Sequence, residues 1–194
     1  MFGPDWPNNG EIDIIEGINL DSTNDITLHT AAGCSINISG SQSGTTLTNA
    51  NCNDNNANNG CGVSTSTANA YGTSFNNNGG GVYATQWESS GIYVWFWPHG
   101  SVPSDVTDGA PVTGGWGLPV VAFNGGSGCT IDDSFQNQNL VFDTTFCGNW
   151  AGTSQSWSEG CSSLAATCID YVAGNPSAFQ QSYWLVNSVK VYQQ

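Results

Sequence analysis

Three carboxylates near the start of this 194-residue chain have the types and spacing that acid–base chemistry needs. Glu11, Asp13 and Glu16 are separated only by isoleucines. Alternating apolar and charged residues have the period of a β-strand, and isoleucine favours that structure. Glu11 and Asp13 then share one face, whereas strict alternation turns Glu16 to the other face. One extra residue, a β-bulge at Ile14 and Ile15, would return Glu16 to the face of the other two acids.

This arrangement suits the hydrolysis of a glycosidic bond. Like charges this close raise one another's pKa, so we expect at least one carboxyl to keep its proton into neutral pH. Glycoside hydrolysis uses one ionised and one protonated carboxyl. Five residues of strand span about 16 Å, less about one residue for the bulge, so long side chains leaning inward can bring two carboxyls to about 5–6 Å. The same spacing also fits an exposed acidic strand edge that deters aggregation.

The segment Glu-Ile-Asp-Ile-Ile-Glu resembles the active-site signature of glycoside hydrolase family 16, in the bulged form of its laminarinase-type β-1,3(4)-glucanases. The resemblance covers essentially the whole chain. Other segments similar to the fungal secreted members are residues 3–7, 27–30, 95–98, 139–143, 146–150 and 183–192. The resemblance implies that Glu11 is the nucleophile, Glu16 the general acid/base, and Asp13 the assisting carboxylate between them.

Four residues are candidates for contact with sugar: Trp6, His29, Trp97 and Asn139. Trp6 lies in the turn before the carboxylates and can act as a sugar platform or as a core plug. For His29, a satisfied polar role competes with contact to sugar or a carboxylate, which its family context suggests. Trp97 ends an aromatic strand face, which can stack on pyranose rings or pack in the core. The resemblance places Asn139 in a strand that crosses the sheet near the site.

The charge of the chain excludes several partners. The formal net charge is -14, and Lys190 is the single basic residue. Such a chain cannot neutralise phosphates, so we expect neither nucleic acid nor an anionic membrane as partner. The sequence contains no apolar stretch long enough to span a membrane. A neutral β-glucan remains compatible with this charge, and we expect a monomer that binds the polysaccharide or its oligosaccharides.

The sequence predicts no cofactor and no metal. Two histidines and the absence of a Cys-x-x-Cys pair leave a zinc site poorly supplied. Residues 51–60 are rich in oxygen donors, but Asp54 is their only acid and the spacing of an EF-hand is missing, so a plain loop is favoured. The sequence also lacks a phosphate-binding loop and a Gly-x-Ser-x-Gly elbow.

Seven cysteines and a glycosylation sequon at Asn37 favour a secreted, disulfide-bonded glycoprotein. An odd number leaves one thiol without a partner inside the chain, and Cys161 and Cys168 are plausible partners of each other. We find no signal peptide, and only ten residues precede Glu11. The resembled family has its catalytic strand near mid-domain, so we expect residues 1–194 to be a single catalytic domain that lacks its N-terminal part.

The pattern of turns and strands predicts an all-β fold. Strands are expected at residues 26–31, 82–88, 92–97, 118–123, 139–146 and 183–192, with a long loop over 34–61 and one short helix over 162–173. Strands joined by Gly, Pro and Asn turns indicate an antiparallel β-sandwich. The resemblance implies a concanavalin-like jelly roll whose concave sheet forms an open cleft.

The predicted function is retaining, double-displacement cleavage of internal β-1,3 or mixed β-1,3/1,4 glucan linkages. Two alternatives stay open. A non-catalytic carbohydrate-binding fragment would bind glucan without releasing reducing ends. A β-glucan transglycosylase would use the same carboxylates and form transfer products when an acceptor is in excess.

Overall fold

The computed structural model describes residues 1–54 and 59–193 of the chain. These residues form two compact units, one made of Met1–Gly17 with Asp21–Leu140, the other of Ile18–Leu20 with the chain from Val141 onward. The expectation of a single catalytic domain over residues 1–194 remains a prediction.

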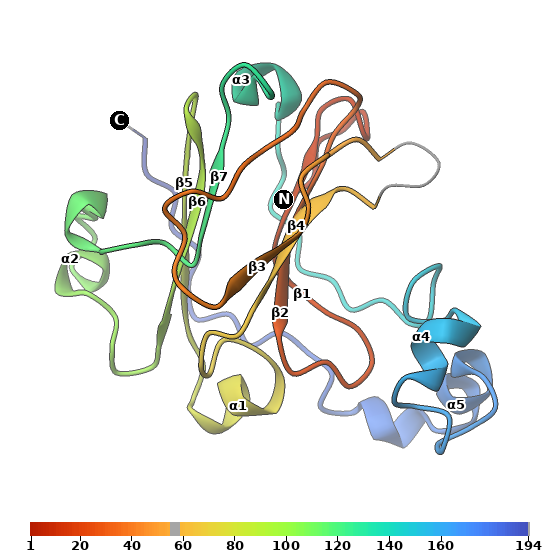
Figure 1. Ribbon diagram of the computed structural model, residues 1–194. Coiled ribbons are helices and arrows are strands. Elements are labelled where there is room, and N and C mark those ends of the chain that lie inside the picture. The colour runs from red at the N-terminus through yellow and green to blue at the C-terminus, as the bar shows by residue number, and fades with distance from the viewer. Residues whose placement is uncertain (55–58, 194) are drawn as a thin grey trace. The chain divides into compact units, whose positions relative to one another are not determined.

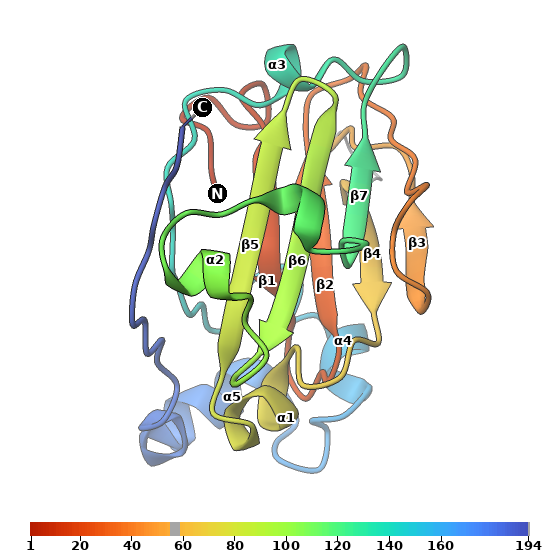
Figure 2. The ribbon, with the colours of Figure 1, turned by 90° about the vertical axis from the view of Figure 1, so that its left-hand side faces the viewer.

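The first unit is built from two antiparallel sheets that face each other (Figures 1 and 2). One sheet has the strand order β1-β2-β4-β3, and the other has the order β5-β6-β7. The strands of the first sheet are β1 (Glu11–Glu16), β2 (Asn24–His29), β3 (Thr45–Asn49) and β4 (Cys61–Thr65). Those of the second are β5 (Gly81–Glu88), β6 (Gly91–Pro98) and β7 (Val121–Asn124). The predicted all-β class and antiparallel sandwich are confirmed.

The core lies between the two sheets because each strand turns alternate side chains inward. On β2, Ile26 and Leu28 are fully buried, and on β6 the inward residues Ile92, Val94 and Phe96 join the same apolar cluster. The β5–β6 hairpin pairs Gly81 with Pro98 through Glu88 with Gly91, as the sequence predicts. The opposite face of β6, which carries Tyr93, Trp95 and Trp97, therefore points away from the first sheet.

Helices are short and more numerous than the sequence predicts. The first unit has α1 (Gly72–Asn77), α2 (Ser104–Thr107), η1 (Thr113–Gly115) and α3 (Ile131–Ser134). The second has α4 (Ser154–Ser158), α5 (Cys168–Gly174) and η2 (Pro176–Phe179). The helix expected over 162–173 begins only at Cys168. The Thr167 side chain caps it by accepting from the Asp170 N–H at 3.1 Å, a local start signal that the apolar spacing did not reveal.

Three expectations about strands and loops are wrong. The segment 34–61 is not one loop, because it contains β3. Residues 55–58 of the expected 51–60 loop lie outside the described residues. No ladder forms over 139–146 or 183–192 within the described chain. In the second unit these two segments are joined by a side-chain bond instead, because Trp184 Nε1 donates to the backbone carbonyl of Asp143 at 2.7 Å. Alternation predicts a strand only where a neighbouring strand supplies hydrogen bonds.

Three disulfides connect Cys34 with Cys129, Cys52 with Cys61, and Cys147 with Cys168. The predicted pairing of Cys161 with Cys168 is wrong, because Cys147 takes that partner at a Cα–Cα distance of 5.7 Å. Cys161 is buried with Trp157 in the small apolar cluster of the second unit. Among the helices described, none combines the length and apolar character needed to cross a membrane.

Candidate active site

The register between β1 and β2 contains the bulge that the carboxylate spacing predicts. Glu11 pairs with His29 and Asp13 with Thr27, but the next pair is Glu16 with Asp25. Three steps along β1 therefore match two steps along β2. The extra residue turns Glu16 back to the face of Glu11 and Asp13.

One side chain bonds to both flanks of this bulge. Asn24 is the first residue of β2, lies on the core face of the sheet and is fully buried. Its amide nitrogen donates to the Ile14 carbonyl at 2.9 Å, and its amide oxygen accepts from the Glu16 N–H at 3.0 Å. These backbone groups are thus satisfied although the ladder is interrupted between them.

Glu16 is placed electrostatically as a carboxylic acid. Burial is the main cause that raises its pKa, followed by the negative charge of Asp13, and together with Glu11 they bring the pKa to about 7. The His29 imidazole acts in the opposite direction and lowers it. The Glu16 proton is therefore held near neutral pH, as the clustering of like charges predicts.

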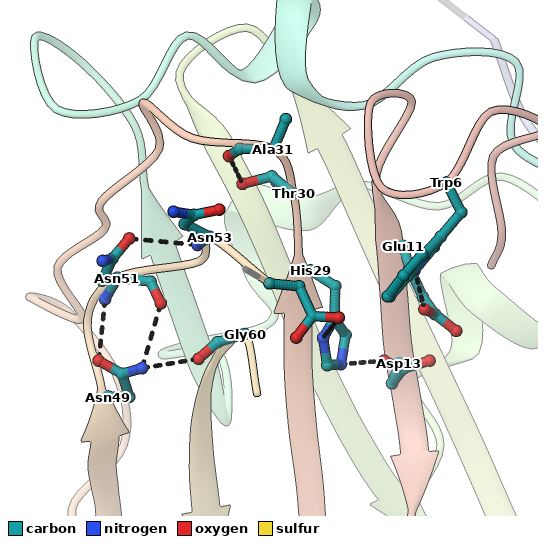
Figure 3. A network of polar contacts seen from close by, with 11 residues as sticks. Trp6, Glu11, Asp13, His29, Thr30, Ala31, Asn49, Asn51, Asn53 and Gly60 are labelled. Atoms are coloured by element: carbon teal, nitrogen blue, oxygen red, sulfur yellow. Dashed lines mark hydrogen bonds and ion pairs between the residues drawn. The ribbon is translucent and has the colours of Figure 1, made fainter. Parts of the chain in front are cut away.

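Glu11 has a different environment from Glu16. Burial and then the charge of Asp13 raise its pKa, while the Trp6 indole opposes this shift. Trp6 Nε1 donates to Glu11 Oε2 at 2.7 Å, and Figure 3 shows the indole beside the carboxylate. Trp6 is exposed, so its ring does not fill a gap in the core. The sequence singles out Trp6 as a sugar contact, and the structure adds that it binds the carboxylate directly.

His29 lies between two acids. Its Nε2 is 3.3 Å from Asp13 Oδ2, which forms an ion pair when the imidazole is protonated (Figure 3). Its Nδ1 is 3.8 Å from Asp54 Oδ2. Burial disfavours the charged imidazole, but Asp13, Glu11 and Asp54 outweigh it and raise the pKa of His29 above its ordinary value.

A cation is the other chemistry that this cluster would suit. Glu11, Asp13 and His29 each offer a ligand atom, and these atoms lie within 4.8 Å of one another. Acidic groups this close are common without an ion, and the ion pair between His29 and Asp13 already accounts for their approach.

Comparison with known proteins identifies the family. A family model described as "XgeA-like, catalytic GH16 domain" matches residues 1–192. The chain belongs to glycoside hydrolase family 16. A probable endo-1,3(4)-beta-glucanase of Aspergillus niger is 46% identical to it over 196 residues. That match covers 98% of this chain but 26% of the Aspergillus protein, so the chain spans about a quarter of that relative's length.

Solved structures from the same family share the fold. An elongating family 16 beta-1,3-glucosyltransferase is similar with a TM-score of 0.84 and 41% identity, covering 94% of this chain and 62% of that one. Laminarinase 16A from Phanerochaete chrysosporium is similar with a TM-score of 0.82 and 44% identity, covering 93% of this chain and 61% of that one. Its structure carries 6-O-glucosyl-laminaritriose in both donor and acceptor sites. The jelly roll expected of family 16 is therefore confirmed.

Two predicted sugar contacts of this family 16 chain lie in different parts of the fold. Trp97 is on the outer face of β6, where its ring packs edge-on against Trp116 at 5.0 Å between centroids. The loop that carries α2 passes over this face (Figure 2). Contact of Trp97 with sugar therefore stays a prediction, and its ring lies on the face of β6 opposite to the core. Asn139 forms an isolated bridge with Phe2, which itself bridges to Glu11, so it lies at the edge next to β1 without forming a ladder.

Three residues at the family 16 site were missed by sequence reasoning. The sequence did not single out Asn24 and placed Asp54 in a plain loop, whereas the fold brings them to Glu16 and His29. Tyr71 is the third. Its hydroxyl would lie 2.6 Å from a Cβ built on Gly17, so glycine lets Tyr71 approach the end of β1 next to Glu16. Burial, followed by the charges of Asp21 and Glu16, raises the pKa of Tyr71.

Proposed function

We propose that this family 16 chain hydrolyses internal β-1,3 or mixed β-1,3/1,4 linkages of β-glucan by a retaining double displacement. The observation that carries the proposal is the β1 bulge, which brings Glu16 to the face of Glu11 and Asp13 with a pKa of about 7. Retaining glycosidases need one carboxylate and one carboxylic acid on the same side of the scissile bond, about 5–5.5 Å apart.

The two glutamates take different roles because their surroundings differ. The Trp6 N–H stabilises the ionised form of Glu11, which suits a nucleophile. Burial and neighbouring negative charge let Glu16 keep its proton near neutral pH, which suits a general acid. Glu11 attacks the anomeric carbon while Glu16 donates its proton to the departing glycosidic oxygen. Glu16, now ionised, takes a proton from water, which displaces Glu11 and restores both groups.

Asp13 lies between Glu11 and Glu16 on β1 and acts on both. Its charge raises the pKa of both glutamates, and its ion pair with His29 limits the repulsion among the three acids. We therefore assign Asp13 as the assisting carboxylate. His29 supports the site through Asp13. The candidates for contact with sugar stay Trp6, His29, Trp97 and Asn139.

The substrate class is supported by the relatives and by the charge of the chain. Endo-1,3(4)-beta-glucanases and a laminarinase that binds a glucan oligosaccharide are similar over nearly all of this chain. With a net charge of -14 the chain suits a neutral polysaccharide better than a polyanion. Three disulfides favour an oxidising compartment, which supports a secreted protein.

The test is the stereochemistry of chemical rescue. Glu11→Ala should abolish release of reducing ends from laminarin, and azide should restore turnover of an activated aryl β-glucoside as the α-glucosyl azide, since only one displacement then occurs. Glu16→Ala is the matched variant. Azide should attack its glycosyl-enzyme and give the β-glucosyl azide after two displacements. Hydrolysis that survives Glu11→Ala would overturn the nucleophile assignment, and binding of laminarin by the unaltered chain without release of sugar would favour a binding fragment.

Transglycosylation is the second candidate, favoured by the similarity to an elongating beta-1,3-glucosyltransferase. The same glycosyl-enzyme would then pass to a sugar hydroxyl instead of water. Incubation with laminari-oligosaccharides at rising acceptor concentration separates the two outcomes. Longer products at the expense of reducing-end release indicate a transferase, whereas only shorter products indicate a hydrolase.

A further inference from the structure

Asn24 is a polar residue where the strand pattern calls for an apolar one. It shares its face of β2 with Ile26 and Leu28, and all three are fully buried. A carboxamide at such a position destabilises the fold unless its donors and acceptor are used. Asn24 uses them on the Ile14 carbonyl and the Glu16 N–H, the two backbone groups that flank Ile15 in the bulge.

We propose that Asn24 is a positioning residue that holds the β1 bulge and thereby keeps Glu16 on the carboxylate face. This inference rests on the proposed acid role of Glu16. Without the bulge, β1 would continue its regular alternation, and Glu16 would point to the opposite face from Glu11 and Asp13. The carboxamide prevents this because it binds one group on each side of the extra residue, and a regular ladder would leave its amide groups without these partners.

Repulsion from neighbouring acids acts to move Glu16 away from the carboxylate face, and the bonds of Asn24 oppose this movement. Asp13, Glu11 and Asp25 all act on Glu16 with the same sign of charge, and only His29 opposes them. Tyr71, which approaches Gly17, is the other titratable group near Glu16. Regular alternation would relieve this repulsion by turning Glu16 to the core face, where the carboxyl is away from the other two acids and cannot act. Asn24 is uncharged and bonds only to backbone, so it fixes position without adding to the titration of the site.

The test separates a misplaced acid from a weakened fold. Asn24→Leu removes both bonds at similar volume, and Asn24→Ala leaves room for water and serves as the milder variant. Asn49→Ala is the matched control, because Asn49 also sits at a bulge of the same sheet. The Asn49 side-chain amide donates to the Gly60 carbonyl at 2.8 Å, but Asn49 belongs to β3 and not to the strands next to the carboxylates. Glu16→Gln sets the scale for complete loss of the acid.

The first readout is the dependence on the leaving group. On laminarin, Asn24→Leu should lose activity by about 10²-fold or more, within the range of a missing general acid. On a dinitrophenyl β-glucoside, whose leaving group needs no proton, kcat/KM, which reports the first displacement, should fall by less than about tenfold. A merely destabilised fold would reduce both activities by the same factor. Equal losses on the two substrates would therefore overturn the proposal.

The second readout does not need activity. The chain has four glutamates, so labelling their carboxyl carbons with ¹³C gives four NMR titrations. In the unaltered chain one of them should have a midpoint near 7. In either Asn24 variant that midpoint should move away from 7 by more than about one pH unit, whereas Asn49→Ala should retain it. A Glu16 midpoint still near 7 in a folded Asn24 variant would refute the positioning role of Asn24. An unaltered chain that shows this midpoint but cleaves no glucan would refute the proposed function instead.

Discussion

Glu16→Gln should make the protein more stable while removing its acid catalyst, and the gain should depend on pH. The folded-state pKa of Glu16, about 7, lies above the ordinary value of 4.5. The fold therefore favours the protonated carboxyl. The contribution of this group to stability is fully present below pH 4.5 and is lost as the pH rises to about 7. Glutamine resembles the protonated acid at every pH, so the variant escapes this loss.

The size of the effect follows from the two pKa values. Each pH unit between 4.5 and about 7 corresponds to ~1.36 kcal/mol, which gives an upper limit of roughly 3 kcal/mol. The Glu16 side chain is only partly buried, and solvent screens its interactions with the neighbouring acids. We therefore expect Glu16→Gln to exceed the unaltered chain by about 1.5 kcal/mol at pH 8 and by almost nothing at pH 4.5.

Urea denaturation followed by tryptophan fluorescence measures this difference, because the chain has eight tryptophans. Curves at pH 4.5, 6, 7 and 8 for both proteins give the free energy of unfolding at each pH. Glu159→Gln is a suitable control, since Glu159 is exposed and follows α4. A difference between Glu16→Gln and the unaltered chain that is constant over this range would refute the argument, as would a variant less stable at pH 8.

Two further predictions concern the neighbours of the carboxylates. Trp6→Phe keeps an aromatic ring but removes the N–H that donates to Glu11, so the pKa of Glu11 should rise. The acidic limb of the kcat/KM profile should then move to higher pH with a loss of roughly tenfold, and an unmoved limb would count against this bond. Asp54→Asn removes a charge 3.8 Å from His29 Nδ1, so the pKa of His29 should fall. NMR can follow it because the chain has two histidines, and an unchanged midpoint would show that Asp54 does not act on the ring.

The features that were predicted from sequence depend on the residue pattern of one strand or of two adjacent strands. The spacing of two and then three residues among Glu11, Asp13 and Glu16 is enough to require a bulge, and the register contains it. The β5–β6 hairpin was equally predictable, because its two strands alternate and a short turn joins them. The hairpin is predictable because its partner strands are adjacent. In β1 the spacing of the acids constrains the strand by itself.

The features that were missed depend on how one segment packs against another. Asn24 has turn-like neighbours, and its role becomes visible only when β2 is paired with β1. Trp97 shows the same limit in another form. Alternation establishes that it shares a face with Trp95, but not which face of β6 meets the first sheet. The core cluster of Ile92, Val94 and Phe96 shows that Trp97 lies on the outer face.

The two ways of disabling the acid should have opposite effects on stability, and this contrast tests the physical account of the site. Glu16→Gln removes a group that the fold holds in an unfavourable charge state above neutral pH, so the protein gains stability there. Asn24→Leu leaves two backbone groups of the bulge without partners, so the protein should lose about 1–3 kcal/mol at any pH. Both variants should fail on laminarin for the same reason, an absent proton donor. If both variants lost stability at pH 8, burial and repulsion could not be what raises the pKa of Glu16. If both gained it, the bonds of Asn24 could not be what holds the bulge.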